Sequence, residues 1–188
     1  QLCVPNNFTT LAGNTPTAPA TGSWSVVGGS AIISTPGSPT SGVTNLGIGT
    51  NTLRWTMHNG ACANPASADD VVITVFDNAQ PNADAGADQE ACSTLPTTTL
   101  TANTANAPAT GLWSLVSGSG TIASAGNSTT IVSGMGTGAN VFAWTVTNGV
   151  CGTTDDEVTV LVYDVNNPVA NAGPDQGLCT PSTSAVMA

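Results

Sequence analysis

The chain contains no lysine, and Arg54 is its single strongly basic residue, whereas 11 residues are acidic. The formal net charge of -10 argues against a nucleic-acid partner, because phosphate groups are bound mainly by lysine and arginine. The same charge argues against attachment to an anionic membrane surface. The sequence also has no apolar run of about 18 residues, so it predicts no membrane-spanning helix.

The chain does have internal repetition. The sequence from Cys3 to Cys62 recurs without a gap 89 positions later, from Cys92 to Cys151. A second stretch, residues 83–92, recurs 87 positions later at residues 170–179. We therefore expect three units, which are repeat 1 at residues 1–78, lacking its first strand, repeat 2 at residues 79–165, and the first strand of a third repeat at residues 166–188.

Both copies consist of short runs of alternating apolar and polar residues separated by Gly, Pro, Asn and Ser, without apolar residues at helical spacing. In the first copy we expect strands at 8–12, 22–27, 31–34, 40–45, 51–58 and 70–77. In the second copy we expect strands at 98–102, 111–116, 121–123, 129–133, 140–147 and 157–164. Such a series of short strands predicts an all-β protein built of tandem immunoglobulin-like β-sandwich repeats.

The connections predict how the repeats follow one another. Asn59-Gly60 and Asn148-Gly149 each come directly after a strand, and Asn-Gly favours a type I′ hairpin turn. The linkers at residues 77–84 and 164–171 are short, and each has one proline and no glycine. Short linkers of this composition favour sandwiches arranged end to end with limited flexing.

The cysteines indicate a disulfide framework. In each copy the two cysteines are 59 positions apart, and the simplest pairing joins Cys3 to Cys62 and Cys92 to Cys151. Matched cysteines in small units rich in Thr, Ser, Gly and Pro are typical of an oxidising compartment. We therefore place the protein outside the cell.

Cys179 has no partner in this pairing scheme. Its partner could lie in a continuation of the repeats, in which case the chain is a piece of a longer protein. Alternatively, residues 171–188 could fill the vacant strand of the next subunit by donor-strand exchange.

The residues needed for catalysis are few. His58 is the only histidine, and Thr147 takes its place in the second copy. No serine or threonine has a histidine partner that recurs in both copies, so we expect no enzyme. Without a C-x-x-C motif, a metal-thiolate site is not expected either.

Acidic residues recur between the copies, and several flank the linkers. The recurring pairs are Asp69 with Asp156, Asp70 with Glu157, Asp77 with Asp164, and Asp88 with Asp175. Carboxylates at the end of one sandwich and the start of the next could supply several oxygens to calcium, the one cofactor considered. The alternative is that these acids are solvated and protect strand edges.

Four tryptophans recur as two pairs, Trp24 with Trp55 and Trp113 with Trp144. A small sandwich needs large apolar anchors, and the chain has few other aromatic residues. We therefore expect a cross-sheet core pair in each copy, and not a platform on which sugars stack.

Together the motifs resemble a known family of repeats. They are NAGPDQGLC at residues 171–179, PATG-x-W-S, SGSGTI at 117–122, GTN-x-x-x-W-T at 49–56, N-G-x-C and a closing D-x-V-x-V strand. This string resembles the PKD-like or immunoglobulin-like repeats of giant Bacteroidota surface proteins, which are similar to gliding-motility adhesins and other cargo of type IX secretion. The resemblance implies a β-sandwich, a disulfide per copy and export to the cell surface.

These features favour a structural segment of an extracellular adhesin stalk or cell-surface filament, with neighbouring repeats as its partners. One alternative is a carbohydrate-binding module that recognises surface polysaccharide, although the loops at 14–21 and 103–110 lack aromatic residues. Another is a pilus-like subunit that assembles by donor-strand exchange through residues 171–188.

Overall fold

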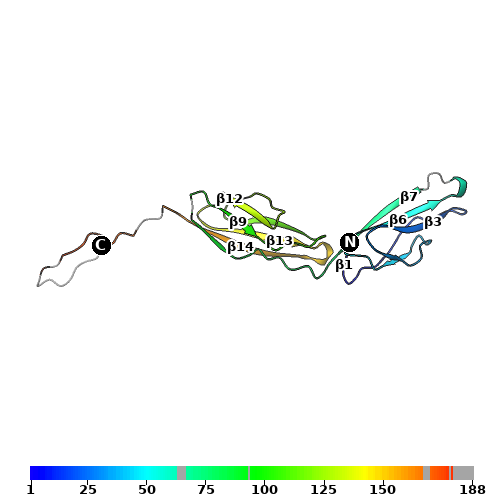
Figure 1. The fold of residues 1–188 in the computed structure, drawn as a ribbon, viewed down its shortest axis with the longest axis horizontal. Coiled ribbons are helices and arrows are strands. Elements are labelled where there is room, and N and C mark those ends of the chain that lie inside the picture. Colours follow the sequence, from blue (N-terminus) through cyan, green and yellow to red (C-terminus); the bar gives the residue numbers. More distant parts are fainter. Residues whose placement is uncertain (63–66, 93, 167–169, 178, 180–188) are drawn as a thin grey trace.

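The computed structural model describes residues 1–62, 67–92, 94–166, 170–177 and 179. These residues form two β-sandwiches that follow one another along the long axis of the molecule (Figure 1), and residues 170–177 lie beyond the second sandwich. Among the described residues, no helix is long and apolar enough to cross a membrane.

Repeat 1 folds into two facing sheets. Its elements are β1 (Leu2–Cys3), β2 (Thr9–Thr10), β3 (Thr21–Gly28), β4 (Ile32–Ile33), β5 (Gly42–Thr44), β6 (Gly49–His58), the 3-10 helix η1 (Gly60–Cys62) and β7 (Ser67–Phe76). The larger sheet has the strand order β1-β7-β6-β3, and the smaller one has the order β2-β5-β4.

Repeat 2 has the same architecture. Its elements are β8 (Gln89–Cys92), β9 (Thr97–Thr101), β10 (Thr110–Ser117), β11 (Thr121–Ile122), β12 (Thr129–Ser133), β13 (Gly138–Thr147), η2 (Gly149–Cys151) and β14 (Thr153–Tyr163). The sheets have the orders β10-β13-β14-β8 and β11-β12-β9. This is the strand order of an immunoglobulin-like sandwich, with the first strand paired in parallel with the last.

All twelve expected strands are present, with ends shifted by a few residues. Two further strands, β1 and β8, were missed because neither shows an alternating pattern. In repeat 1, β1 pairs with β7 as β8 pairs with β14. The first strand that repeat 1 was predicted to lack is the counterpart of residues 83–88, which form no strand in repeat 2, so the predicted repeat boundaries stay a prediction. For the expected strand at 166–188, residues 170–177 have no strand, and residues 167–169, 178 and 180–188 lie outside the described residues.

The expected type I′ turns are also absent. Asn148 has a φ of -106°, so it does not adopt the positive φ that this turn requires, whereas Gly149 does with a φ of 51°. The chain instead passes through η2 before β14 begins, and Thr147 pairs with Thr153. A five-residue connection therefore replaces the two-residue turn.

A pair of tryptophans lies at the centre of each core. Trp24 and Trp55 have ring centroids 5.1 Å apart, and those of Trp113 and Trp144 are 5.2 Å apart. All four side chains are buried. The members of each pair lie opposite one another on adjacent strands, β3 with β6 and β10 with β13. Each pair is therefore a cross-strand pair within one sheet, and the expected cross-sheet arrangement was wrong.

A glycine beside each pair makes room for it. A Cβ atom at Gly22 would collide with the ring of Trp55, and one at Gly111 would collide with the ring of Trp144. The recurrence of glycine two residues before the first tryptophan of each pair thus has a packing cause.

A buried asparagine closes the loop before the long central strand of each sandwich. Asn51 is 1% exposed, and its amide donates to the carbonyl oxygens of Gly47, Gly49 and Ile73. Its Oδ1 accepts from the backbone N–H of Ser30. Asn140 makes the corresponding bonds in repeat 2. One amide side chain therefore satisfies backbone groups from three segments that would otherwise be buried without partners.

Candidate functional site

The two cysteines of repeat 1 lie at opposite ends of its sandwich. Both β1 and Gly49, the first residue of β6, pair with Val75 of β7, so Cys3 lies near the start of β6. Cys62 follows the end of that ten-residue strand. Such a strand spans about 30 Å, whereas a disulfide requires Cα atoms within about 7 Å of each other. The predicted pairing of Cys3 with Cys62 is therefore wrong.

The same geometry corrects the second predicted pairing. Cys92 pairs with Tyr163 at the end of β14, while Cys151 lies two residues before the start of that strand. The 11 residues of β14 separate the two cysteines. Cys92 and Cys151 therefore also lie at opposite ends of one sandwich.

The disulfide that is present joins the two repeats. Cys3 is bonded to Cys151, with Cα atoms 5.3 Å apart and a sequence separation of 148. Cys62, Cys92 and Cys179 are free and exposed. The bond indicates a non-reducing environment. It joins the end of repeat 1 from which the linker leaves to the connection between β13 and β14 of repeat 2.

Apolar and polar contacts surround this disulfide. Phe76, the last residue of β7, is 7% exposed, and a Cβ atom added at Gly149 would collide with its ring. The backbone N–H of Val4 donates to the carbonyl oxygen of Phe76 over 3.0 Å. From the other side, Asn148 Nδ2 donates to the carbonyl oxygen of Asp77 over 2.7 Å. The end of β7 is thus held by groups of both repeats.

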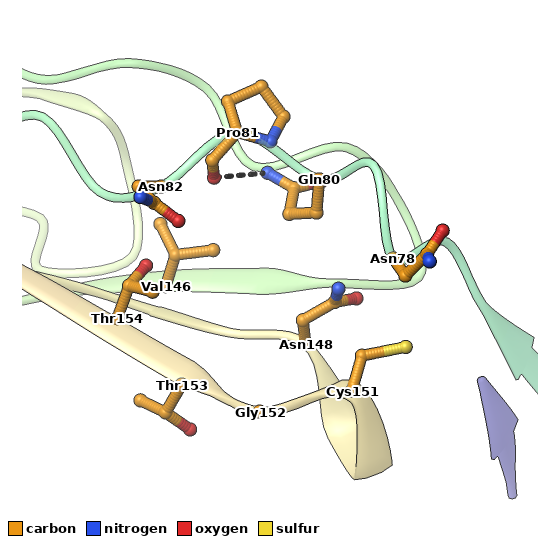
Figure 2. Close-up of a pocket in the computed structure, with 10 residues that line it drawn as sticks. All are labelled: Asn78, Gln80, Pro81, Asn82, Val146, Asn148, Cys151, Gly152, Thr153 and Thr154. Atoms are coloured by element: carbon orange, nitrogen blue, oxygen red, sulfur yellow. Dashed lines mark hydrogen bonds between the residues drawn. The ribbon is translucent and has the colours of Figure 1, made fainter. Parts of the chain in front are cut away.

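The linker lies against repeat 2 along its length. Its residues Asn78, Gln80, Pro81 and Asn82 face Asn148, Cys151 and Thr154 (Figure 2). These residues line a small cavity of about 140 Å³. The Oε1 atom of Gln80 accepts from the backbone N–H of Asn106 over 2.9 Å. Because these contacts are made to repeat 2 by a segment that directly follows repeat 1, the linker restricts how the sandwiches can rotate.

The end of the linker completes the core of repeat 2. We call residues 83–88 the capping segment. Its Ala85 is 2% exposed and belongs to the apolar core, and the backbone N–H of Ala85 donates to Asp156 Oδ2 over 2.8 Å. Asn103 binds the segment from the opposite side, through its Oδ1 to the N–H of Asp84 and through its backbone N–H to the Asp84 carbonyl oxygen. Asp88 accepts from the backbone N–H of Thr159.

The predicted calcium ligands serve other roles where the structure shows a bond. Asp156 and Asp88 hold the capping segment as described, Asp77 and Asp164 each accept from a backbone N–H two residues later, and Asp70 pairs with Arg54. The described residues contain no group of three or more acidic, histidine or cysteine side chains that could hold a metal ion. The recurring acids Asp69, Glu157 and Asp175 therefore belong to no such group, and calcium binding stays a prediction.

The Arg54–Asp70 pair belongs to repeat 1 alone. Arg54 Nε and Nη2 donate to the two carboxylate oxygens of Asp70 over 2.7 and 2.8 Å. The hydrogen bond from Arg54 lowers the pKa of Asp70, and its charge acts in the same direction. Ala143 takes the place of Arg54 in repeat 2, where it lies opposite Glu157.

Several residues of this site were missed from the sequence. Phe76 and Ala85 form contacts at the junction but were given no role there, and Asn148 was predicted only as a hairpin-turn residue. The usable signal was recurrence, since Ala85 recurs as Ala172 and the aromatic residue Phe76 as Tyr163. His58, the only histidine, is exposed at the end of β6.

No family model matches the chain, and no curated protein matches it. Among solved structures, the chain is similar to the PKD domain from the KIAA 1837 protein, with 26% identity and a TM-score of 0.40 over 48% of this chain and 93% of that one. Extracellular domains 3–5 of Drosophila OTK give 12% identity and a TM-score of 0.46 over 86% of this chain and 58% of that one. The fibronectin(III)-like modules of Clostridium thermocellum CbhA give 10% identity and a TM-score of 0.38 over 89% and 100%. The fold assignment rests on the strand order.

Proposed function

We propose that this chain is a structural repeat segment that transmits force within an extracellular adhesin stalk or cell-surface filament. The observation that supports the proposal most directly is the Cys3–Cys151 disulfide, which joins the two sandwiches across their junction. The linker contacts and the buried capping segment restrict the same junction without a covalent bond. A repeat protein with such junctions transmits force between its ends while its sandwiches keep their relative orientation.

The disulfide also determines which residues carry tension. When the chain is pulled from its two ends, the force passes directly from Cys3 to Cys151. The residues between the two cysteines are shielded, so the length that they contain cannot be released while the bond is intact, and the load falls on β14 (Thr153–Tyr163). This arrangement suits a stalk that must stay short and stiff under shear.

The resemblance of the repeats to those of giant Bacteroidota surface proteins supports a proposal about where the protein is located. It favours the cell surface as the location and type IX secretion as the export route, with gliding adhesion as one use. The tryptophans offer no platform for stacking sugars because all four are buried. We therefore propose adjoining repeats, and not polysaccharide, as the main partners.

The proposal is tested by pulling single molecules through handles at residues 1 and 188, with and without reductant. Under reducing conditions, unfolding of the 148-residue span between the cysteines should release about 500 Å of additional length at roughly 3.5 Å per residue. Under oxidising conditions this length should not appear. If the oxidised chain extends as far as the reduced chain, the repeats are not joined by the disulfide and the proposed force-transmitting role is wrong.

A further inference from the structure

Repeat 1 has an open groove at the place that the capping segment fills in repeat 2. The groove has a volume of about 690 Å³ and is lined by residues 9–14 together with Trp55, Asp69 and Val71. Val71 is 37% exposed there, whereas its counterpart Val158 is fully buried in repeat 2. An apolar position that belongs to the core in one copy is therefore uncovered in the other.

The polar groups that hold the capping segment recur in this groove. Asp69 lies opposite Trp55, as Asp156 lies opposite Trp144. Asn14 corresponds to Asn103, but without a segment to bind, its Oδ1 accepts from Trp55 Nε1 over 3.1 Å.

In repeat 2 the equivalent asparagine is occupied by the capping segment. Trp144 Nε1 accordingly has no hydrogen-bond partner within the described part of the chain. Asn14 and Asn103 thus show the same site in its empty and filled states.

A second capping segment is present and exposed. Residues 170–175 read ANAGPD, and the capping segment 83–88 reads ADAGAD. Gly173 has a φ of 80° and Gly86 a φ of 83°. The N–H of each glycine donates to the side chain two residues earlier, over 2.9 Å to Asn171 and 3.0 Å to Asp84. Residues 170–175 therefore already have the local conformation of the docked segment.

The other parts of the junction recur at the two ends of the molecule in the same way. Tyr163 corresponds to Phe76 but is 48% exposed instead of 7%. Gly60 corresponds to Gly149, and a Cβ atom added there would meet no atom within 4 Å. Cys92 corresponds to Cys3 and Cys62 to Cys151, and both of these counterparts are free and exposed. We call Tyr163, Cys92 and residues 170–175 the exit face, and the groove, Gly60 and Cys62 the entry face.

We propose that the exit face of one copy docks on the entry face of a second copy, with residues 170–175 in the groove of repeat 1 and Cys92 bonded to Cys62. The exit and entry faces lie at opposite ends of the elongated molecule, so they cannot meet within one copy, whereas a second copy of this chain presents the complementary face (Figure 1). The inference rests on the proposed function and names the partner of its stalk segment. Head-to-tail contacts of this kind extend the molecule into a filament.

The bond between the copies forms by thiol–disulfide exchange with a small disulfide such as oxidised glutathione. The Cys92 thiolate attacks the small disulfide and releases one glutathione thiol. The Cys62 thiolate then attacks the mixed disulfide at the Cys92 sulfur and releases the second. The two protein thiols are oxidised, the small disulfide is reduced, and the two protons end on the released thiols.

The docking step is tested by sedimentation equilibrium of a chain in which Cys62, Cys92 and Cys179 are replaced by Ser. We expect concentration-dependent association. Ala172→Gln should weaken it by about tenfold or more, because position 172 becomes buried on docking as Ala85 is. Pro174→Gln is the matched control, since its counterpart Ala87 stays exposed in the docked segment. Both substituted positions are exposed in the free chain, so the fold is not affected.

The covalent step is tested with the Cys179→Ser chain in a glutathione redox buffer, followed by non-reducing electrophoresis and mass spectrometry of the joined peptides. We expect dimers and longer species joined through Cys62 and Cys92, and their loss in Cys62→Ser. The inference is overturned if the chain stays monomeric, if Ala172→Gln and Pro174→Gln associate equally, or if like-with-like cysteine pairs are as abundant as Cys62–Cys92. These outcomes leave the pulling experiment untouched, so a stiff internal junction without association would disprove only the head-to-tail contact.

Discussion

Repeats 1 and 2 share their strand order, their tryptophan pair and their buried asparagine, yet their cores are closed to different extents. The core of repeat 2 includes Ala85 from the preceding linker, and Val158 beneath it is fully buried. Repeat 1 has no such segment over it, and Val71 is exposed to 37%. The comparison teaches that the core of repeat 2 is completed by the segment that precedes it, whereas the corresponding positions of repeat 1 are open in this structure.

The largest effect is expected from the bond that joins the repeats. Cys3→Ser should lower the free energy of unfolding by about 5 kcal/mol, because the disulfide closes a 148-residue loop and the chain-entropy model gives this value. Urea unfolding under non-reducing conditions measures the change. Cys62→Ser is the control and should have almost no effect, since Cys62 is free and exposed. Equal losses in the two variants would restore the pairing within one repeat.

The next largest loss of stability should be equal in the two repeats. Asn51→Ala and Asn140→Ala should each cost about 3 kcal/mol or more, because several buried backbone groups lose their partner at once. Thermal unfolding of each variant provides the measurement. Asn127→Ala, at an exposed position, should change stability by less than about 0.5 kcal/mol. A small loss at either buried asparagine would show that its network is not required.

A smaller loss of stability is expected when the capping segment is displaced, so that the groove of repeat 2 is open as it is in repeat 1. Ala85→Gln should displace the capping segment at a cost of about 2 kcal/mol, because the longer polar side chain does not fit the core. Hydrogen exchange of the Thr159 amide should accelerate, since it loses its bond to Asp88, and the Trp144 indole should gain Asn103 as a partner. Ala87→Gln is the matched exposed control. Unchanged exchange at Thr159 in Ala85→Gln would contradict the capping role.

The smallest effect concerns the ion pair found in repeat 1. The hydrogen bond from Arg54 lowers the pKa of Asp70 in the folded state. The ion pair therefore stabilises the fold at pH values above the pKa that Asp70 has in the unfolded chain. This contribution is lost as the pH falls through the lowered pKa of the folded state. Arg54→Ala should raise the pKa of Asp70 towards its ordinary value, as measured by NMR titration of the carboxyl group. The change in stability should be small because both side chains are exposed. An unmoved Asp70 titration would show that the pair does not persist in solution.

The sequence predicted the local features of the fold well. The four tryptophans were predicted to lie in the core and are buried there, and the predicted strand at 129–133 coincides with β12. These features depend on neighbouring residues, so a periodic pattern contains them. The turn type at Asn148 was wrong because the number of residues in the connection, and not the Asn-Gly pair alone, determines it.

The disulfide pairing could not be read from the repeat pattern. Because Cys3 and Cys92 are equivalent, as are Cys62 and Cys151, the spacing alone is equally compatible with bonds within a repeat and bonds between successive repeats. Deciding between them requires knowing at which end of the sandwich each cysteine lies. That information was partly available, since the expected strand at 51–58 is too long for its two ends to be joined by a disulfide.

The most direct test of the account is a map of the disulfide after cleavage at the glutamates. With free thiols first blocked in denaturant, cleavage after Glu90 and Glu157 yields a fragment with Cys3 and Cys62 and a fragment with Cys92 and Cys151. Because Cys3 is bonded to Cys151, we expect these two fragments to stay joined until reductant is added. Separate fragments under non-reducing conditions, each with its own internal disulfide, would contradict it.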